Sequence, residues 1–199
     1  TGGRWIIEDS AFLHNTSDGL DLLYARLPGS SIEIRRTIAE GNAGNQFKTN
    51  GPTLIESSII VGNCGFFDGQ PFTYNVDNCR AYGNALDLTL RPGNHVTVTN
   101  STLTSEGDCL VVAGCEGTCN GSDPFDVDYS VITGTKDIPP CPGTHDLCEA
   151  SPGLVNPSVD AFDAHLLQNS PAIDAGDNSV CAAPDYGGMA RPLDGNGDG

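Results

Sequence analysis

The chain has 199 residues, the size of a single domain, and carries 26 acidic against nine basic residues, a formal net charge of −17. This balance excludes a typical nucleic-acid-binding protein, because phosphate backbones require a basic surface. No run of 18 apolar residues is present, so we expect no membrane span. Eight cysteines in such an acidic chain indicate disulfide bonds, and therefore a secreted, extracellular or cell-surface protein.

A spacing pattern recurs along residues 5–135. An aliphatic residue is followed three positions later by Ser, Thr or Cys. An apolar residue follows two positions after that, and in most copies Asn follows three positions further on. The first five copies start 27, 21, 21 and 22 residues apart, and the sixth starts 29 residues later. Recurrence at about 20 residues marks stacked units that bury their apolar faces on one another. The copies are Ile7/Ser10/Phe12/Asn15, Ile34/Thr37/Ala39/Asn42, Ile55/Ser58/Ile60/Asn63, Val76/Cys79/Ala81/Asn84, Val98/Ser101/Leu103/Glu106 and Val127/Ser130/Ile132/Thr135.

Within each copy the side chains alternate with a period of two, which is the periodicity of a β-strand. The pattern therefore predicts an all-β chain folded as a right-handed parallel β-helix, a solenoid of about six turns. An antiparallel sandwich of short strands is the alternative. In the β-helix the asparagines of the first four copies share one column, which predicts a ladder of side-chain amides.

The chain divides into two regions of one domain. Residues 1–135 carry the repeats, and because the first unit opens without a cap we expect further rungs upstream. Residues 136–199 form a disulfide-stapled irregular region, a C-terminal cap and an acidic tail. Within them, residues 161–181 hold a short apolar segment before a Ser-Pro turn, and we expect this segment to cover the exposed edge of the last rung.

Cysteine positions predict three local disulfide bonds. One closes a Pro-Gly loop, one joins two adjacent rungs, and one joins two members of a cluster at residues 109–119. A metal site at the CxxxC sequence of that cluster is the alternative. The predicted pairs are Cys141–Cys148, Cys64–Cys79 and Cys109–Cys115.

A charged column is the candidate site. Asp21 and Lys48 occupy equivalent positions, 14 residues after the start of the first and second copies, and Asp18 lies in the same turn as Asp21. Neighbouring strands are about 4.8 Å apart, so Lys48 should stand over Asp21. One interpretation is a surface ion pair worth about 0–1 kcal/mol. The other is a carboxylate cluster that holds Ca²⁺ beside a basic amine.

Residues 6–90 resemble the β-helical pectate lyases of polysaccharide lyase family nine. The resemblance rests on residues 17–21 (SDGLD), on residues 45–51 (NQFKTNG) and on the repeats that follow them. It implies that Asp18 and Asp21 are calcium ligands and that Lys48 is the base that removes the proton next to a uronate carboxylate. Ser17 stands where that family has a further carboxylate.

Two motifs near the C-terminus carry less chemistry. Residues 170–177 (SPAIDAGD) with 191–195 (RPLDG) resemble the closing segment of exported bacterial β-helix proteins, which ends the helix. The tail places Asp194, Asn196 and Asp198 at alternate positions, as in the first half of a calcium-binding loop. A flexible acidic tail is the alternative interpretation.

Two functions remain open on these grounds. The first is an extracellular protein that binds an acidic polysaccharide or cell-surface glycan and cleaves it as a calcium-dependent lyase, with Lys48 as the base. The second is a non-catalytic module of the cell surface, an adhesin or filament subunit whose copies associate end to end.

Overall fold

The computed structural model is nearly all β and contains three parallel sheets. In each sheet every pairing is parallel, which does not fit an antiparallel sandwich. The structure describes residues 2–25, 27–63, 66–67, 70–71, 83–90, 94–106, 109–115, 125–136, 143–148, 151–181, 184–195 and 197. This part of the chain contains no helix long and apolar enough to cross a lipid bilayer.

Each of the three sheets has five strands. Sheet A consists of β1 (Arg4–Glu8), β4 (Ser31–Arg35), β7 (Thr53–Glu56), β12 (Val96–Thr99) and β15 (Phe125–Asp128). Sheet B consists of β2 (Ala11–Leu13), β5 (Ile38–Glu40), β8 (Ile59–Gly62), β13 (Thr102–Ser105) and β16 (Val131–Thr133). Sheet C consists of β3 (Leu20–Leu22), β6 (Phe47–Thr49), β11 (Leu86–Leu90), β14 (Leu110–Cys115) and β17 (Thr135–Lys136).

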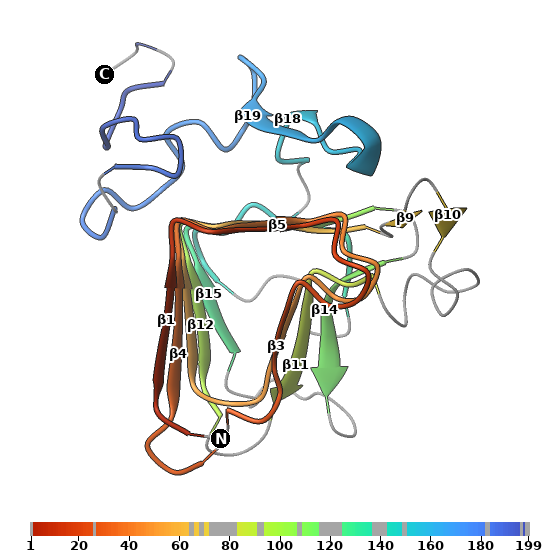
Figure 1. Cartoon of the computed structure of the whole chain (residues 1–199). Helices are drawn as coiled ribbons and strands as arrows, with labels where there is room; N and C mark the ends of the chain where they lie inside the picture. Colours follow the sequence, from red (N-terminus) through yellow and green to blue (C-terminus); the bar gives the residue numbers. More distant parts are fainter. Residues whose placement is uncertain are drawn as a thin grey trace.

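The chain visits sheets A, B and C in turn and then returns to sheet A beside its previous strand. In Figure 1 the strands of each sheet lie behind one another, and the three sheets enclose a common interior. Two short antiparallel pairs lie outside the three sheets. They are β9 (Phe66–Phe67) with β10 (Gln70–Pro71), and β18 (Leu154–Asn156) with β19 (Asp163–Leu166), the latter two joined through the 3₁₀ helix η1 (Val159–Ala161).

Aliphatic side chains stack in register inside the three sheets. Along sheet A, Ile7 pairs with Ile34, Ile34 with Ile55, Ile55 with Val98 and Val98 with Val127. The middle members of this column are fully buried, as the strand alternation predicts. In sheet C, Phe47 is buried too, and its ring meets that of Phe12 edge to face with centroids 5.8 Å apart.

The repeat at Val76 does not take the place that its spacing predicts. Strand β12 pairs directly with β7, so no strand lies between Ile55 and Val98, and the column has five members instead of six. Residues 72–82 themselves lie outside the described part of the chain. The repeat pattern gives a false match here, because a spacing of a few apolar and small residues recurs easily by chance. A residue belongs to a column only where its backbone pairs with the neighbouring strand.

The corner between sheets A and B explains the Ser or Thr of the repeat. At each turn the preceding residue has a left-handed backbone, with φ between 47° and 51° at Asp9, Arg36, Ser57, Asn100 and Tyr129. The hydroxyl that follows accepts a hydrogen bond from the backbone of the turn before it. These bonds join the Thr37 amide to Ser58 Oγ (3.2 Å), the Ser58 amide to Ser101 Oγ (3.1 Å) and the Ser101 amide to Ser130 Oγ (3.1 Å).

The predicted ladder of amides forms only at its start. The Asn15 side chain donates to Asn42 Oδ1 at 2.7 Å, and the Asn15 backbone amide donates to the same oxygen at 3.0 Å. In the next turn Asn63 Oδ1 accepts from the Gly41 amide, and Asn84 donates to Asn45 Oδ1. The column breaks after Asn42 because Asn63 Oδ1 accepts from the Gly41 amide and not from Asn42.

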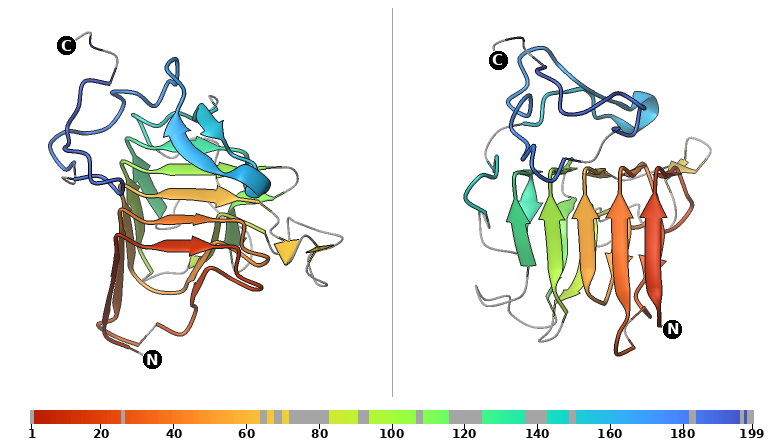
Figure 2. Two further views of the ribbon diagram at one scale, coloured as in Figure 1. Left: turned by 45° about the horizontal axis from the view of Figure 1, so that its top comes forward. Right: turned by 90° about the vertical axis from the view of Figure 1, so that its left-hand side faces the viewer.

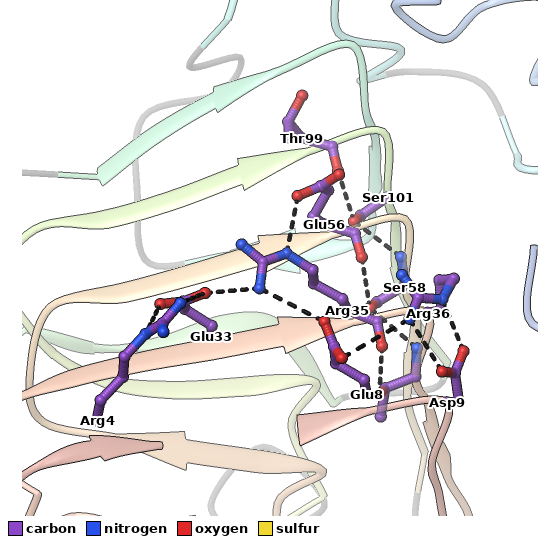
Figure 3. A network of polar contacts seen from close by, with 11 residues as sticks. Arg4, Glu8, Asp9, Glu33, Arg35, Arg36, Glu56, Ser58, Thr99 and Ser101 are labelled. Carbon is purple, nitrogen blue, oxygen red and sulfur yellow. Dashed lines mark hydrogen bonds and ion pairs between the residues drawn. The ribbon is translucent and has the colours of Figure 1, made fainter. Parts of the chain in front are cut away.

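The outer face of sheet A carries a ladder of arginines and carboxylates over its first three strands (Figure 3). Arg35 lies in the middle, with its guanidinium 2.6 Å from Glu33, 3.2 Å from Glu56 and 3.6 Å from Glu8. Arg4 donates two hydrogen bonds to the same Glu33 carboxylate. The ladder therefore joins β1, β4 and β7 by side chains as well as by backbone.

The C-terminal residues do not lie where the sequence predicted. Leu147 forms a parallel bridge with Val131, and Asp146 accepts a hydrogen bond from the Ser130 amide, so residues 143–148 lie along the last rung. Residues 151–181 instead pass over the outer face of sheet B (Figure 2). Asn100 and Asp177 join this segment to the sheet by two hydrogen bonds of 2.7 and 3.0 Å.

Two of the cysteines in the predicted pairs, Cys109 and Cys148, are disulfide-bonded. The other predicted cysteines, Cys64, Cys79, Cys115 and Cys141, lie outside the residues whose side chains the structure describes. The three pairings therefore stay predictions.

Candidate functional site

Sheet C brings the predicted charged column together. Asp21 on β3 pairs in register with Lys48 on β6, which confirms the expected stacking, and Lys48 pairs in register with Asp87 on β11. Phe47 and Thr49 on either side of Lys48 are buried. Because strand side chains alternate, Lys48 is held on the outer face of the sheet by the burial of its neighbours.

Asp18, not Asp21, is the carboxylate that approaches Lys48 from the first turn. Lys48 Nζ lies 3.5 Å from Asp18 Oδ2 and 3.9 Å from Asp87 Oδ2. Asp21 uses Oδ1 to accept a hydrogen bond from the Leu23 amide at 3.0 Å. Lys48 is thus flanked by carboxylates from the turns on both sides.

Asn45 fixes both carboxylates that face the ammonium group. Asp18 Oδ1 accepts from the Asn45 backbone amide at 2.7 Å and from its side-chain amide at 3.2 Å. The same side-chain amide donates to Asp87 Oδ2 at 3.4 Å. Gly44 makes this approach feasible, since a Cβ at that position would lie 2.5 Å from Asp18 Oδ1.

The site is half-buried and electrostatically unusual. The side chains of Lys48, Asp18 and Asp87 are 19%, 15% and 32% exposed. Burial raises the pKa of the Asp87 carboxyl above its ordinary value; Lys48 opposes this rise, while Asp18 and Asp21 add to it. A carboxyl held in this way on an accessible face is typical of functional sites.

The calcium site expected at Asp18 and Asp21 stays a prediction. Asp18 and Asp87 direct oxygens at the Lys48 ammonium group, and nowhere in the described part of the chain are three or more His, Cys, Asp or Glu arranged to hold a metal ion. In the tail, Asp194 accepts a hydrogen bond from the Gly197 amide, whereas Asn196 and Asp198 lie outside the described residues. The calcium ligands expected there stay predictions.

Two members of the site were missed from the sequence. Asp87 could have been found, because the triplet Leu-Asp-Leu occurs both at residues 20–22 and at 86–88, and the two triplets flank β6 in the same sheet. Asn45 gives no comparable signal. Its role depends on a side-chain contact with a residue 27 positions earlier.

A second polar cluster lies at the end of sheet B. The Glu40 side chain is 2% exposed and lies 3.0 Å from His14 Nε2, and Asn63 donates to it at 3.5 Å. Burial raises the pKa of Glu40 although His14 and Asn63 oppose the rise. Val159 of the C-terminal segment packs beside Gly41 at this place. The cluster joins three turns to the segment that covers them.

The comparisons with known proteins do not extend these observations. No family model, no curated protein and no solved structure matches the chain. The resemblance to pectate lyases therefore rests on residues 17–21, residues 45–51 and the repeats that follow them.

Proposed function

We propose that the chain is a right-handed parallel β-helix that acts outside the cell and binds an acidic polysaccharide along the outer face of sheet C. The fold is supported by three parallel sheets that the chain visits in turn, and parallel crossovers are right-handed in nearly all proteins. The location is supported by two disulfide-bonded cysteines, which favour an oxidising compartment.

The observation that carries the binding proposal is the position of Lys48 on this face. An acidic chain needs a local cation to contact an anionic polymer, and Lys48 provides one at the centre of a carboxylate-lined strip. Its ammonium group can donate to a uronate carboxylate. Asp18 and Asp87 can accept hydrogen bonds from the neighbouring sugar hydroxyls.

The reaction that suits this arrangement is β-elimination. Lys48, acting as the free amine, would take the proton from C5 of the uronate and become an ammonium ion, and the C5–H electron pair would form the C4–C5 double bond. The glycosidic oxygen would leave from C4 and take up a proton from water. No step of this scheme uses a metal ion. Calcium remains a separate prediction from the family resemblance, and a titration of activity with added Ca²⁺ tests it.

Incubation with polygalacturonate tests the proposal. We expect an ultraviolet-absorbing unsaturated product, lost in Lys48→Ala and kept in Arg191→Ala, which removes a cation of the C-terminal segment instead. Binding to immobilised polygalacturonate should fall in the same variant. Full product formation and full binding by Lys48→Ala would overturn the proposal.

A second candidate function is a non-catalytic module of the cell surface. It is favoured by exposed apolar side chains in the C-terminal segment, Val180 (48% exposed) and Met189 (58% exposed), which could contact another molecule. Glycan binding that survives Lys48→Ala without any product would support this function. Electron microscopy would show whether the copies form filaments.

A further inference from the structure

A cavity lies between sheet B and the C-terminal segment that covers it. Its volume is about 210 Å³, and one side is formed by residues at the ends of two neighbouring strands, β13 and β16. Pro152, Leu154 and Pro157 form the opposite side, called here the apolar wall. Pockets for drug-sized ligands measure about 300–1,000 Å³, so this cavity suits a smaller organic molecule.

The side formed by the sheet belongs to a column on the outer face of sheet B. Val61, Thr104 and Thr133 pair in register on β8, β13 and β16, and Glu40 has the equivalent position on β5. Leu103, next to Thr104, belongs to the core, so the column faces outward. Glu40, Val61 and Thr104 are nevertheless at most 6% exposed. The C-terminal segment therefore shields this column from water.

The apolar wall is held in place by its own contacts. Ser170 Oγ donates a hydrogen bond to the Pro152 carbonyl at 2.6 Å, and Leu154 is only 5% exposed. Further along the segment, the two hydrogen bonds between Asn100 and Asp177 fasten it to the sheet. The cavity is thus part of the folded chain before any ligand binds.

Glu106 gives the cavity a negative charge. It follows β13 directly, lines the cavity and is half-buried. Burial raises the pKa of its carboxyl, and no described Lys or Arg opposes the rise. Burial also raises the pKa of Glu40, and Glu106 adds to that rise although His14 and Asn63 oppose it. Two carboxylates therefore act together at this end of sheet B, in a chain whose net charge is −17.

The remaining lining matches an organic cation. An ammonium group carries three donors and no acceptor, so it is satisfied by a carboxylate and by hydroxyl oxygens. The apolar wall suits the alkyl chain that such a group carries. A bare metal ion lacks its ligands, since the described residues include no group of three His, Cys, Asp or Glu that could hold one. The hydroxyls that line the cavity are those of Thr104, Ser105, Thr133 and Ser151.

We propose that this cavity binds a primary alkylammonium group, with the nitrogen at Glu106 and the hydroxyls and the alkyl chain against the apolar wall. A free amine and a lysine side chain of a peptide both present this chemistry, and the test below separates them. The site does not depend on the glycan-binding proposal, because it lies on sheet B and uses no residue of the Lys48 cluster on sheet C.

Titration with n-butylammonium chloride, followed through backbone amide chemical shifts, tests the proposal. We expect saturable shifts at Ser105, Glu106, Thr133 and Leu154, which line the cavity. 1-Butanol has the same chain without the charge and should bind at least about tenfold more weakly. Equal binding of 1-butanol, or no saturable shift at these residues at roughly 100 mM n-butylammonium, would overturn the proposal.

The source of the ammonium group follows from a second titration, with the peptide glycyl-lysyl-glycine. Tighter binding of the peptide than of n-butylammonium would identify a lysine side chain as the ligand. Weaker binding would identify a free amine, because the cavity would then exclude the peptide backbone.

Two variants make the test specific. Glu106→Gln keeps the shape of the side chain without its charge and should weaken n-butylammonium binding by roughly tenfold or more. Ser151→Phe should also abolish binding, because the ring fills the cavity from an exposed position without changing the charge. Circular dichroism shows whether each variant is folded.

Asp126→Asn is the matched control for the lost charge. Asp126 is 71% exposed on sheet A, so its replacement lowers the net negative charge equally but leaves the cavity intact. We expect unchanged n-butylammonium binding in this variant. Binding that survives in Glu106→Gln, or that falls equally in Asp126→Asn, contradicts the proposal.

Discussion

The outer faces of sheets A and C both pair cations with carboxylates, yet the pKa values of these carboxylates shift in opposite directions. On sheet A, hydrogen bonds from Arg4 and Arg35 lower the pKa of Glu33 from 4.5 to about 2. On sheet C, the pKa of Asp87 is raised by burial although Lys48 lies 3.9 Å away. Guanidinium groups reach Glu33 at 2.6 Å, whereas the described residues supply Lys48 with no carboxylate closer than 3.5 Å.

The difference separates a stabilising surface from a candidate site. The arginine ladder of sheet A satisfies its carboxylates, so the first three turns gain stability from them (Figure 3). The Lys48 cluster keeps the Asp87 carboxyl in an environment that opposes its ionisation. Such local costs are expected where a ligand supplies the missing partners.

The largest effect on stability is expected from Arg35→Met. Methionine keeps an apolar stem of similar length but removes the guanidinium that lies among Glu8, Glu33 and Glu56. Surface ion pairs contribute up to about 1 kcal/mol each, so the loss of this network should lower the free energy of unfolding by about 1–2 kcal/mol. Urea denaturation at neutral pH measures it.

Arg191→Met is the matched control for this prediction. Arg191 makes one long contact of 3.9 Å with Asp185 in the C-terminal segment, so its removal should change the free energy of unfolding by less than about 0.5 kcal/mol. Equal losses in the two variants would mean that the ladder on sheet A contributes no more than a single exposed pair.

Glu33→Gln should lower the free energy of unfolding by about 1 kcal/mol after allowance for solvent screening. This smaller loss should depend on pH. A carboxyl with a lowered folded pKa contributes stability above its unfolded pKa and loses it as the pH falls through the folded pKa. The wild type should therefore be more stable than the variant by the full amount above about pH 4.5. The difference in the free energy of unfolding should vanish near pH 2.

Urea denaturation of both proteins between pH 2 and pH 7 provides the measurement. A difference in unfolding free energy that stays constant over this range would show that Glu33 acts through packing and not through its charge.

The sequence predicted the parts of the molecule that local rules decide. Period-two alternation and the recurring spacing of aliphatic and hydroxyl residues placed Ile34 and Ile55 in one column and Lys48 over Asp21. These features repeat within about 20 residues, so a spacing rule can find them. The all-β class and the parallel sheets follow from the same rule.

What the sequence did not predict depends on contacts between distant positions. Val98 pairs with Ile55, which lies 43 positions earlier, and only this backbone pairing shows that the Val76 repeat is not in the column. Likewise the C-terminal segment is positioned by Asn100 and Asp177, which are 77 residues apart. Nothing in either local sequence indicates that these two side chains meet.

The smallest effect is expected from Asp87→Asn, and its sign is opposite to the others. Because burial raises the folded pKa of Asp87, the folded state binds a proton more readily than the unfolded chain, and ionisation at neutral pH costs stability. An uncharged amide of the same shape removes this cost. We therefore expect a gain in the free energy of unfolding of less than about 1 kcal/mol at pH 7, discounted for partial exposure.

The gain from Asp87→Asn should shrink as the pH falls through the raised pKa and disappear below 3.8, the ordinary value, where the wild-type carboxyl is protonated in both states. Asp21→Asn is the control, because Asp21 is exposed and its side-chain oxygen can still accept from the Leu23 amide. A loss of stability at neutral pH would show that the pair with Lys48 outweighs burial, and the faces of sheets A and C would then serve the same structural purpose.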